Sequence, residues 1–220
     1  MRIPSKSIGG LLWAAVCAFV ASKAAAQNLV LNPGFELAGA TPNIATNWNV
    51  LAATGGTFAL VTRTNATPNS GSFDMYLESA GGAGAPNTDV RSDPMAVTFG
   101  TSYNFSFMAK NPLKSGGANP QWDLFWLNAA NNPVGAPVFV SFSSVGSSYT
   151  LVTNSVLLTP PVGATKATVG WIQATGAGPT DHWITQIDDV SFTAVPEPTT
   201  MMLVGLGLLG AITFGRKHKS

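Results

Sequence analysis

Between residues 27 and 194 the chain is a series of short runs rich in β-branched and aromatic residues, separated by clusters of Gly, Pro, Asn and Ser. Such runs predict strands and such clusters predict turns. No apolar stripe of useful length with the period of a helix interrupts them. The predicted strands are Asn28–Leu31, Thr57–Thr62, Phe73–Glu78, Tyr103–Ala109, Trp122–Leu127, Val138–Ser141, Thr150–Leu158, Ala167–Gln173 and Thr185–Phe192. This many evenly spaced strands predict an all-β, antiparallel two-sheet sandwich of the jelly-roll type.

The run from Tyr103 to Ala109 alternates apolar and smaller or polar residues. Because successive side chains of a strand point to opposite faces, Tyr103, Phe105 and Phe107 are predicted to point into the core.

The first 26 residues have the features of a secretory signal peptide. Arg2 and Lys6 form a basic start, an apolar run covers residues 11–20, and three alanines at 24–26 offer a cleavage site. We therefore expect one exported domain at residues 27–194. The chain's single cysteine, Cys17, lies in the apolar run, so we expect no disulfide in the mature domain.

The last 26 residues, 195–220, contain a different set of signals. Val195, Pro196, Glu197 and Pro198 form a motif that an extended linker accommodates best, because proline fixes φ and lacks an N–H donor. An uncharged apolar run at 201–214 follows and predicts a short transmembrane helix at about residues 200–215. A basic tail at 216–220, which begins with Arg216 and Lys217, should stay cytoplasmic and leave the domain outside the inner membrane.

This C-terminal segment resembles the PEP-CTERM sorting signal of Gram-negative envelope proteins. The resemblance implies recognition by an exosortase, a membrane protease that removes the helix and releases or transfers the protein to the cell surface or extracellular matrix. The alternative is a plain C-terminal anchor that is never cut.

Charge limits the partners of the domain. Six of the 11 Lys and Arg residues and one of the 10 Asp and Glu residues lie outside residues 27–194, which leaves five positive and nine negative side chains, a net charge of −4. A weakly acidic domain with scattered basic residues has no electrostatic reason to bind nucleic acid.

A second resemblance covers nearly the whole domain. Residues 28–36 and 187–192 look like the first and last strands of galactose-binding-like jelly rolls, the fold of carbohydrate-binding modules attached to xylanases and glucanases. Residues 98–103, before a long strand, and 161–164, before residues 168–171, fit intermediate landmarks of that family. The resemblance implies polysaccharide binding, although a fold does not fix a function.

The same resemblance implies a structural calcium ion where the first and last strands meet. The matching positions are Glu36, with the Gly34 carbonyl beside it, and Asp188, which we expect to share the inward-facing parity of Val190 and Phe192. Calcium accepts carboxylates and carbonyls, and would offset the cost of a buried carboxylate. The alternative is that both carboxylates accept backbone N–H bonds.

A sugar site requires aromatic rings beside amides or carboxylates, because pyranose faces stack on rings and sugar hydroxyls need hydrogen-bond partners. Four tryptophans are the candidates: Trp122 and Trp126 on one strand face with Asp123 and Asn128 nearby, Trp171 with Gln173, and Trp183 with Gln186. The alternative for each is ordinary packing in the core or at its rim.

Catalytic motifs are missing from the sequence: it offers no nucleophile elbow, histidine-rich metal set or phosphate-binding loop. We therefore expect a non-enzymatic, carbohydrate-binding exported protein. Two alternatives stay open. One is a structural surface or matrix protein without a specific ligand, and the other is a glycan-active hydrolase that uses two carboxylates.

Overall fold

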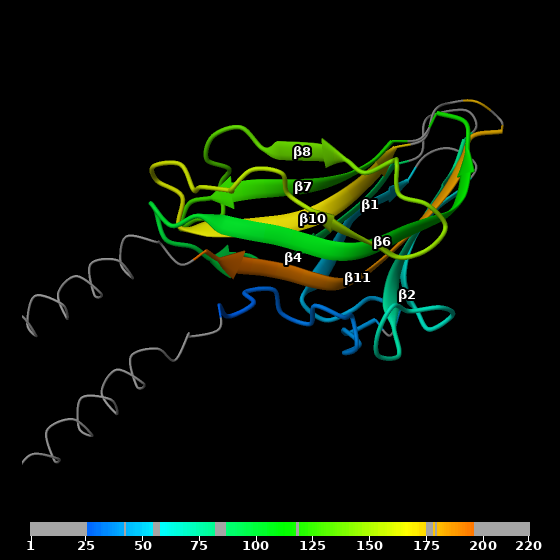
Figure 1. The fold of residues 1–220 in the computed structure, drawn as a ribbon, viewed down its shortest axis with the longest axis horizontal. Coiled ribbons are helices and arrows are strands. Elements are labelled where there is room, and N and C mark those ends of the chain that lie inside the picture. The colour runs from blue at the N-terminus through cyan, green and yellow to red at the C-terminus, as the bar shows by residue number, and fades with distance from the viewer. Residues whose placement is uncertain are drawn as a thin grey trace, which may run out of the picture.

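A computed structural model describes residues 26–41, 43–54, 58–81, 87–117, 119–174, 178 and 180–195. These residues form eleven strands in two antiparallel sheets and no helix (Figure 1). Among them there is accordingly no helix that could cross a membrane. The predicted signal peptide and nearly all of the predicted sorting segment lie outside the described residues.

The first sheet has the strand order β1-β4-β10-β7-β8, and β5 pairs with β10 beside this path. The strands are β1 (Trp48–Thr54), β4 (Asn87–Ser92), β5 (Met95–Ala96), β7 (Asn119–Leu127), β8 (Val138–Ser141) and β10 (Lys166–Ala174). Neighbours come from distant parts of the chain, since β4 and β7 flank β10.

The second sheet has the order β2-β3-β11-β6-β9. Its strands are β2 (Phe58–Thr64), β3 (Asp74–Ala80), β6 (Tyr103–Ser115), β9 (Thr150–Thr153) and β11 (His182–Ala194). β11 pairs with β6 over most of its length, with a register shift between Asp188 and Ser191 where Asp189 takes a positive φ of 49°. This bulge breaks the alternation of side chains near the end of β11.

An aromatic core fills the space between the sheets. Tyr103, Phe105 and Phe107 are buried there, which confirms the prediction for this strand. Tyr103 stacks on Phe192 with ring centroids 5.0 Å apart, and Phe105 lies 5.1 Å from Trp122 of the opposite sheet. These contacts join β6 and β11 of one sheet to β7 of the other, as expected for a jelly-roll sandwich.

The predicted all-β, two-sheet architecture is therefore confirmed, but some predicted strands are wrong. At residues 28–31 only an isolated bridge from Asn28 to Thr193 forms, because one backbone bond, from Leu29 to Phe192, is joined there by bonds of the Asn28 side chain to β11. The strand predicted at 150–158 ends at Thr153, because the Asn154 side chain accepts the next N–H bond, from Phe105. Strands β1, β4 and β5 were not predicted.

Candidate functional site

The four predicted tryptophan platforms lie inside the protein. Trp122 and Trp171 are 1% exposed, and Trp126 and Trp183 are 5% exposed. Trp122, Trp126 and Trp171 belong to the hydrophobic core, where Trp171 stacks on Trp48 at 5.2 Å. A ring without an accessible face cannot stack on a sugar, so the prediction that these four residues bind a glycan is wrong.

The opposite faces of the same strands carry a charged cluster, which we call the Arg91 cluster: Asp89 and Arg91 on β4, and Asp123 on β7. Because Val90 packs in the core, its neighbours Asp89 and Arg91 share the outer face of the first sheet. By the same alternation Asp123 lies opposite Trp122, on the outer face. The structure thus places a charged group on the outer face of the sheet whose inner face holds Trp122, Trp126 and Trp171.

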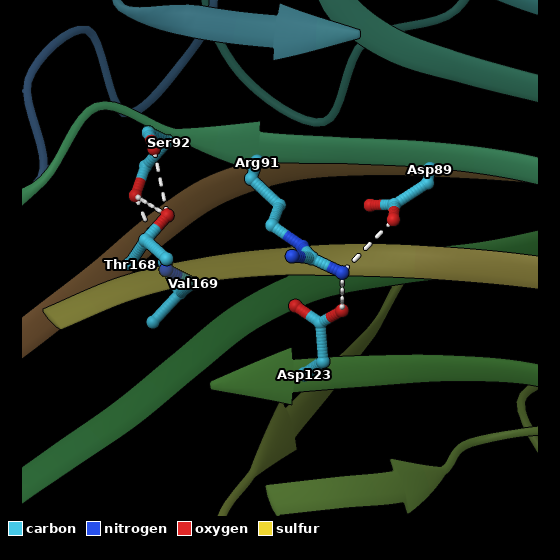
Figure 2. A network of polar contacts seen from close by, with 6 residues as sticks. All are labelled: Asp89, Arg91, Ser92, Asp123, Thr168 and Val169. Carbon is cyan, nitrogen blue, oxygen red and sulfur yellow. Dashed lines mark hydrogen bonds and ion pairs between the residues drawn. The ribbon is translucent and has the colours of Figure 1, made fainter. Parts of the chain in front are cut away.

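Gly170 on β10, the strand between β4 and β7, allows the Arg91 cluster to form. Arg91 pairs with Gly170 of β10, and Gly170 pairs with Asp123, so the three residues are in register across three strands. A Cβ atom at Gly170 would lie 2.3 Å from the Val90 carbonyl oxygen and 2.6 Å from Arg91 Cγ. Figure 2 shows the Arg91 side chain lying across β10, between the two carboxylates. Glycine at 170 is therefore required for Arg91 to reach Asp123.

Both ion pairs of the cluster use the same nitrogen. Arg91 Nη2 lies 2.9 Å from Asp89 Oδ2 and 3.2 Å from Asp123 Oδ2, the second without the alignment of a hydrogen bond (Figure 2). Four buried polar atoms of the cluster have no hydrogen-bond partner in the described structure: Asp89 Oδ1, Arg91 Nε, Asp123 Oδ1 and Asp123 Oδ2. Buried polar atoms are normally satisfied, so this density of unpaired atoms marks the cluster.

Burial controls the charge of the cluster. Asp123 is fully buried, and loss of hydration raises its pKa to about 7 although the Arg91 charge opposes the shift. Burial raises the pKa of Asp89 in the same way, again against the attraction of Arg91. A single guanidinium therefore faces two carboxyl groups that the surroundings drive toward the neutral form.

A groove of about 290 Å³ lies over this part of the sheet. Arg91 and Phe125 line it, together with Asn49, Leu51, Ser92, Pro94, Leu127, Asn131, Pro133 and Thr168. The Arg91 guanidinium carbon lies 4.0 Å from the centroid of the Phe125 ring, and Phe139 of β8 packs edge-on against that ring at 5.8 Å. Phe139 is 47% exposed and supplies an accessible aromatic surface beside the cluster.

Beneath the groove a hydrogen-bonded pair fixes β4 to β10. Thr168 Oγ1 donates to the Ser92 carbonyl at 2.7 Å, and the Val169 N–H donates to Ser92 Oγ at 3.2 Å (Figure 2). All atoms of this pair are buried. These buried hydrogen bonds therefore hold β4 and β10 together beneath the groove.

The residues predicted to hold calcium do come together. A Cβ at Gly34 would lie 3.6 Å from Asp188 Oδ1 and 3.8 Å from Glu36 Cγ. The parity expected for Asp188 is wrong, because the bulge after it breaks the alternation, but the residue is fully buried. Burial raises its pKa to about 6, against the effect of backbone hydrogen bonds.

Both carboxylates accept backbone N–H bonds from one connection, residues 65–73 between β2 and β3. Asp188 Oδ2 accepts from Asn69 and Ser70 at 2.9 Å, and Glu36 Oε1 accepts from Ser72 and Phe73 at 2.8 and 3.1 Å. Among the described residues no group of three or more His, Cys, Asp or Glu side chains could hold a metal ion. The donor set fits a hydrogen-bonded clamp, and calcium stays a prediction.

Sequence reasoning missed Arg91 and Phe139, and it named Asp123 only as a neighbour of the tryptophans. A signal was present: in residues 88–92 a single apolar residue, Val90, separates Asp89 from Arg91, so both charges must share a face. The run was not identified as a strand because it is largely polar.

Residues 194–217 match the family model of the PEP-CTERM protein-sorting motif. The chain carries a PEP-CTERM sorting motif. The four motif residues, Val195 to Pro198, and Arg216 and Lys217 fall within the match. No curated protein matches the chain.

Solved structures share the fold of the domain. Among them are the enzymatically active domain of bacteriophage CBA120 tailspike protein 4 (TM-score 0.57, 18% identity), a carbohydrate-binding module of the β-sandwich superfamily (0.52, 14%) and the arabinose-bound MgGH51 α-L-arabinofuranosidase (0.50, 14%). Each match covers 76% of this chain, but only 21%, 63% and 26%, respectively, of the other chain. At these identities the likeness establishes the β-sandwich fold alone.

Proposed function

We propose that this protein is an exported, PEP-CTERM-sorted protein whose sandwich domain binds a polysaccharide on the outer face of the first sheet. The observation that carries the proposal is that Arg91, held by two largely buried carboxylates, lines a groove. Sugar hydroxyls accept hydrogen bonds, so they complement the guanidinium donor that faces this groove.

In this proposal Arg91 is the residue that binds the ligand, and its neighbours position it. Asp89 and Asp123 hold Nη2, while the Phe125 ring supports the guanidinium plane. This leaves Nη1 to donate to hydroxyls in the groove, because Nη2 faces the two carboxylates and Nε is buried. The exposed ring of Phe139 then offers the apolar surface on which a pyranose stacks.

A glycan array probed with the purified protein, followed by titration of any hit, tests this function. We expect Arg91→Ala to abolish binding. Phe139→Ala should weaken binding about tenfold, since loss of an aromatic stacking contact costs roughly 1–1.5 kcal/mol of binding free energy. Arg91→Lys is the matched variant: it keeps the charge near Asp89 but lacks the planar fork, so it should also bind weakly.

Lys114→Ala serves as the control, because Lys114 lies on β6 of the second sheet. If the array shows no binding, the protein fits the alternative of a structural surface or matrix protein. Release of product from a bound glycan would instead support a hydrolase that uses Asp89 and Asp123, a possibility that keeps the enzyme question open for experiment.

We further propose that residues 1–26 are removed as a signal peptide, that residues 27–194 form the exported domain, and that an exosortase-type membrane protease cleaves near Val195–Pro198. The matched motif at 194–217 supports the last step. Mass spectrometry of protein extracted from the surface of an exosortase-containing cell should find a C-terminus near this motif. Recovery of only chains that end at Ser220 would overturn the proposal.

A further inference from the structure

One end of the sandwich brings together the first and last described segments of the chain and a group of exposed apolar side chains. We call it the tail end, because Val195, the last described residue, lies there with its N–H donating to the Ser102 carbonyl at 2.8 Å. The N-terminal part joins the same end, since the Leu29 N–H donates to the Phe192 carbonyl at 2.9 Å. In Figure 1 this is the left end, where the orange strand β11 finishes.

Two turns at the tail end are built alike. In residues 98–101 the Thr101 N–H donates to Thr98, with Gly100 at φ 84°, and in residues 161–164 the Ala164 N–H donates to Pro161, with Gly163 at φ 91°. A positive φ at the third position is typical of a type II turn. The turns are neighbours, because the Val97 N–H donates to the Thr165 carbonyl at 3.0 Å.

Each turn places a large apolar side chain at its tip. Phe99 is 61% exposed and Val162 is 79% exposed, each immediately before the glycine. Val156 and Leu157 are also exposed, and Leu158 after them bonds to Tyr103 at the start of β6. Turn tips are normally polar, so two apolar tips side by side mark a surface that meets an apolar partner.

The tail end also lacks charge over long stretches of sequence. Residues 94–109 and 124–165, which contain both turns, have no Asp, Glu, Lys or Arg. The opposite end differs: Lys114, Asp181 and His182 lie where β6 ends and β11 begins, and His182 Nε2 lies within hydrogen-bond distance of Glu78 Oε1, at 2.7 Å. Lys166 follows the second turn, and its Nζ donates to the Ala129 carbonyl and to Asn131 Oδ1. A surface with so little charge and with apolar turn tips is suited to lipid of any headgroup charge.

The sequence after Val195 limits the distance between the tail end and a membrane. Only residues 196–200 separate Val195 from the apolar run at 201–214, and five residues reach at most about 18 Å when fully extended. If the run is inserted before processing, the tail end is therefore held close to the headgroup layer.

We infer that the turns around Phe99 and Val162, together with Val156 and Leu157, seat on the lipid bilayer while the sorting tail is uncut. The partner is the membrane surface itself, and contact is apolar, not electrostatic. The inference rests on the proposed insertion of the tail and is independent of glycan binding.

The chain without its native cysteine allows a direct test. In the mature chain, residues 27–220, which contains no cysteine, an environment-sensitive fluorophore is attached at Val162→Cys and, as the matched control, at Phe58→Cys, an exposed apolar position at the opposite end. The proteins are placed in phosphatidylcholine vesicles with or without spin labels on the lipids. At position 162 we expect a blue-shifted emission that the spin-labelled lipids quench. At position 58 we expect neither the shift nor the quenching.

Equal quenching at positions 162 and 58 would overturn the inference. A label at 162 that is shielded from water but not quenched by spin-labelled lipids would also overturn it, because a second copy or another protein would then cover the turns. Adding Phe99→Ser to the Val162→Cys chain should reduce the quenching, since the neighbouring tip no longer inserts. Flotation of the chain with the vesicles reports tail insertion separately, so failure of insertion and failure of the seating can be distinguished.

Discussion

The outer faces of the two sheets both carry buried charged clusters, and the clusters differ in how well they are satisfied. On the second sheet Lys110 Nζ donates to the carbonyl and the hydroxyl of Thr67, both at 2.7 Å, and lies 4.3 Å from the ring centroid of Tyr149. Asp74 Oδ2 accepts from Tyr149 and from Gln186 at 2.5 and 2.8 Å. In this cluster only Asp74 Oδ1 lacks a partner among the described residues.

On the first sheet four buried polar atoms of the Arg91 cluster have no hydrogen bond among the described residues. The connection that contains Thr67, together with Tyr149, covers the second cluster, whereas the first cluster lies under a groove. A satisfied buried network stabilises and specifies the fold, while an unsatisfied one costs stability unless a ligand completes it. The comparison therefore indicates a structural role for Lys110 and supports the binding role proposed for Arg91.

The largest expected effect is the loss of the charge in the satisfied cluster. Lys110→Met keeps the apolar stem over Tyr149 but leaves the buried Asp74 carboxyl without its nearby positive charge, which should lower the free energy of unfolding by about 3–5 kcal/mol. Urea denaturation measures this change. Glycan binding per folded molecule should not change, and an equally large loss of binding would contradict the separation of the two faces.

A somewhat smaller effect is expected on the pH dependence of stability, through Asp123 of the Arg91 cluster. Folding raises the pKa of Asp123 from 3.8 to about 7, so between these values the folded state holds a proton that the unfolded state has released. This group's contribution to stability is therefore greatest below about pH 4 and declines as pH rises to about 7. Asp123→Asn cannot ionise, and should gain roughly 2–4 kcal/mol relative to the wild type between pH 5 and pH 8.

Chemical denaturation of both proteins across this pH range measures the difference. Asp89→Asn is the matched variant, because Asp89 belongs to the same cluster and its pKa is also raised, yet it keeps some exposure. It should flatten the pH dependence less than Asp123→Asn does. Parallel curves for wild type and Asp123→Asn would show that Asp123 stays ionised in the fold.

The contrast between the faces also explains what the sequence could predict. Strands with strong apolar alternation, such as β6 with Phe105 and Phe107, were found because packing decides them locally. Strand β4, which carries Asp89 and Arg91, was not found because it is largely polar and Val90 is its one large apolar residue. The tryptophans were misassigned for a related reason: alternation shows which residues share a face, but not which face is buried.

The smallest expected effect concerns the predicted calcium ion at Gly34, Glu36 and Asp188, next to the satisfied cluster. An ion bound only by the folded state, present at a hundred times its dissociation constant, adds about 2.7 kcal/mol, so chelation should lower the melting temperature by several degrees. Asp188→Asn should remove the difference between melts with and without chelator. The variant also weakens the bonds from Asn69 and Ser70, so its melting temperature should fall even in chelator. A wild-type melt that chelation leaves unchanged would assign both carboxylates to the hydrogen-bonded clamp, and the second face would then be completed by protein groups alone.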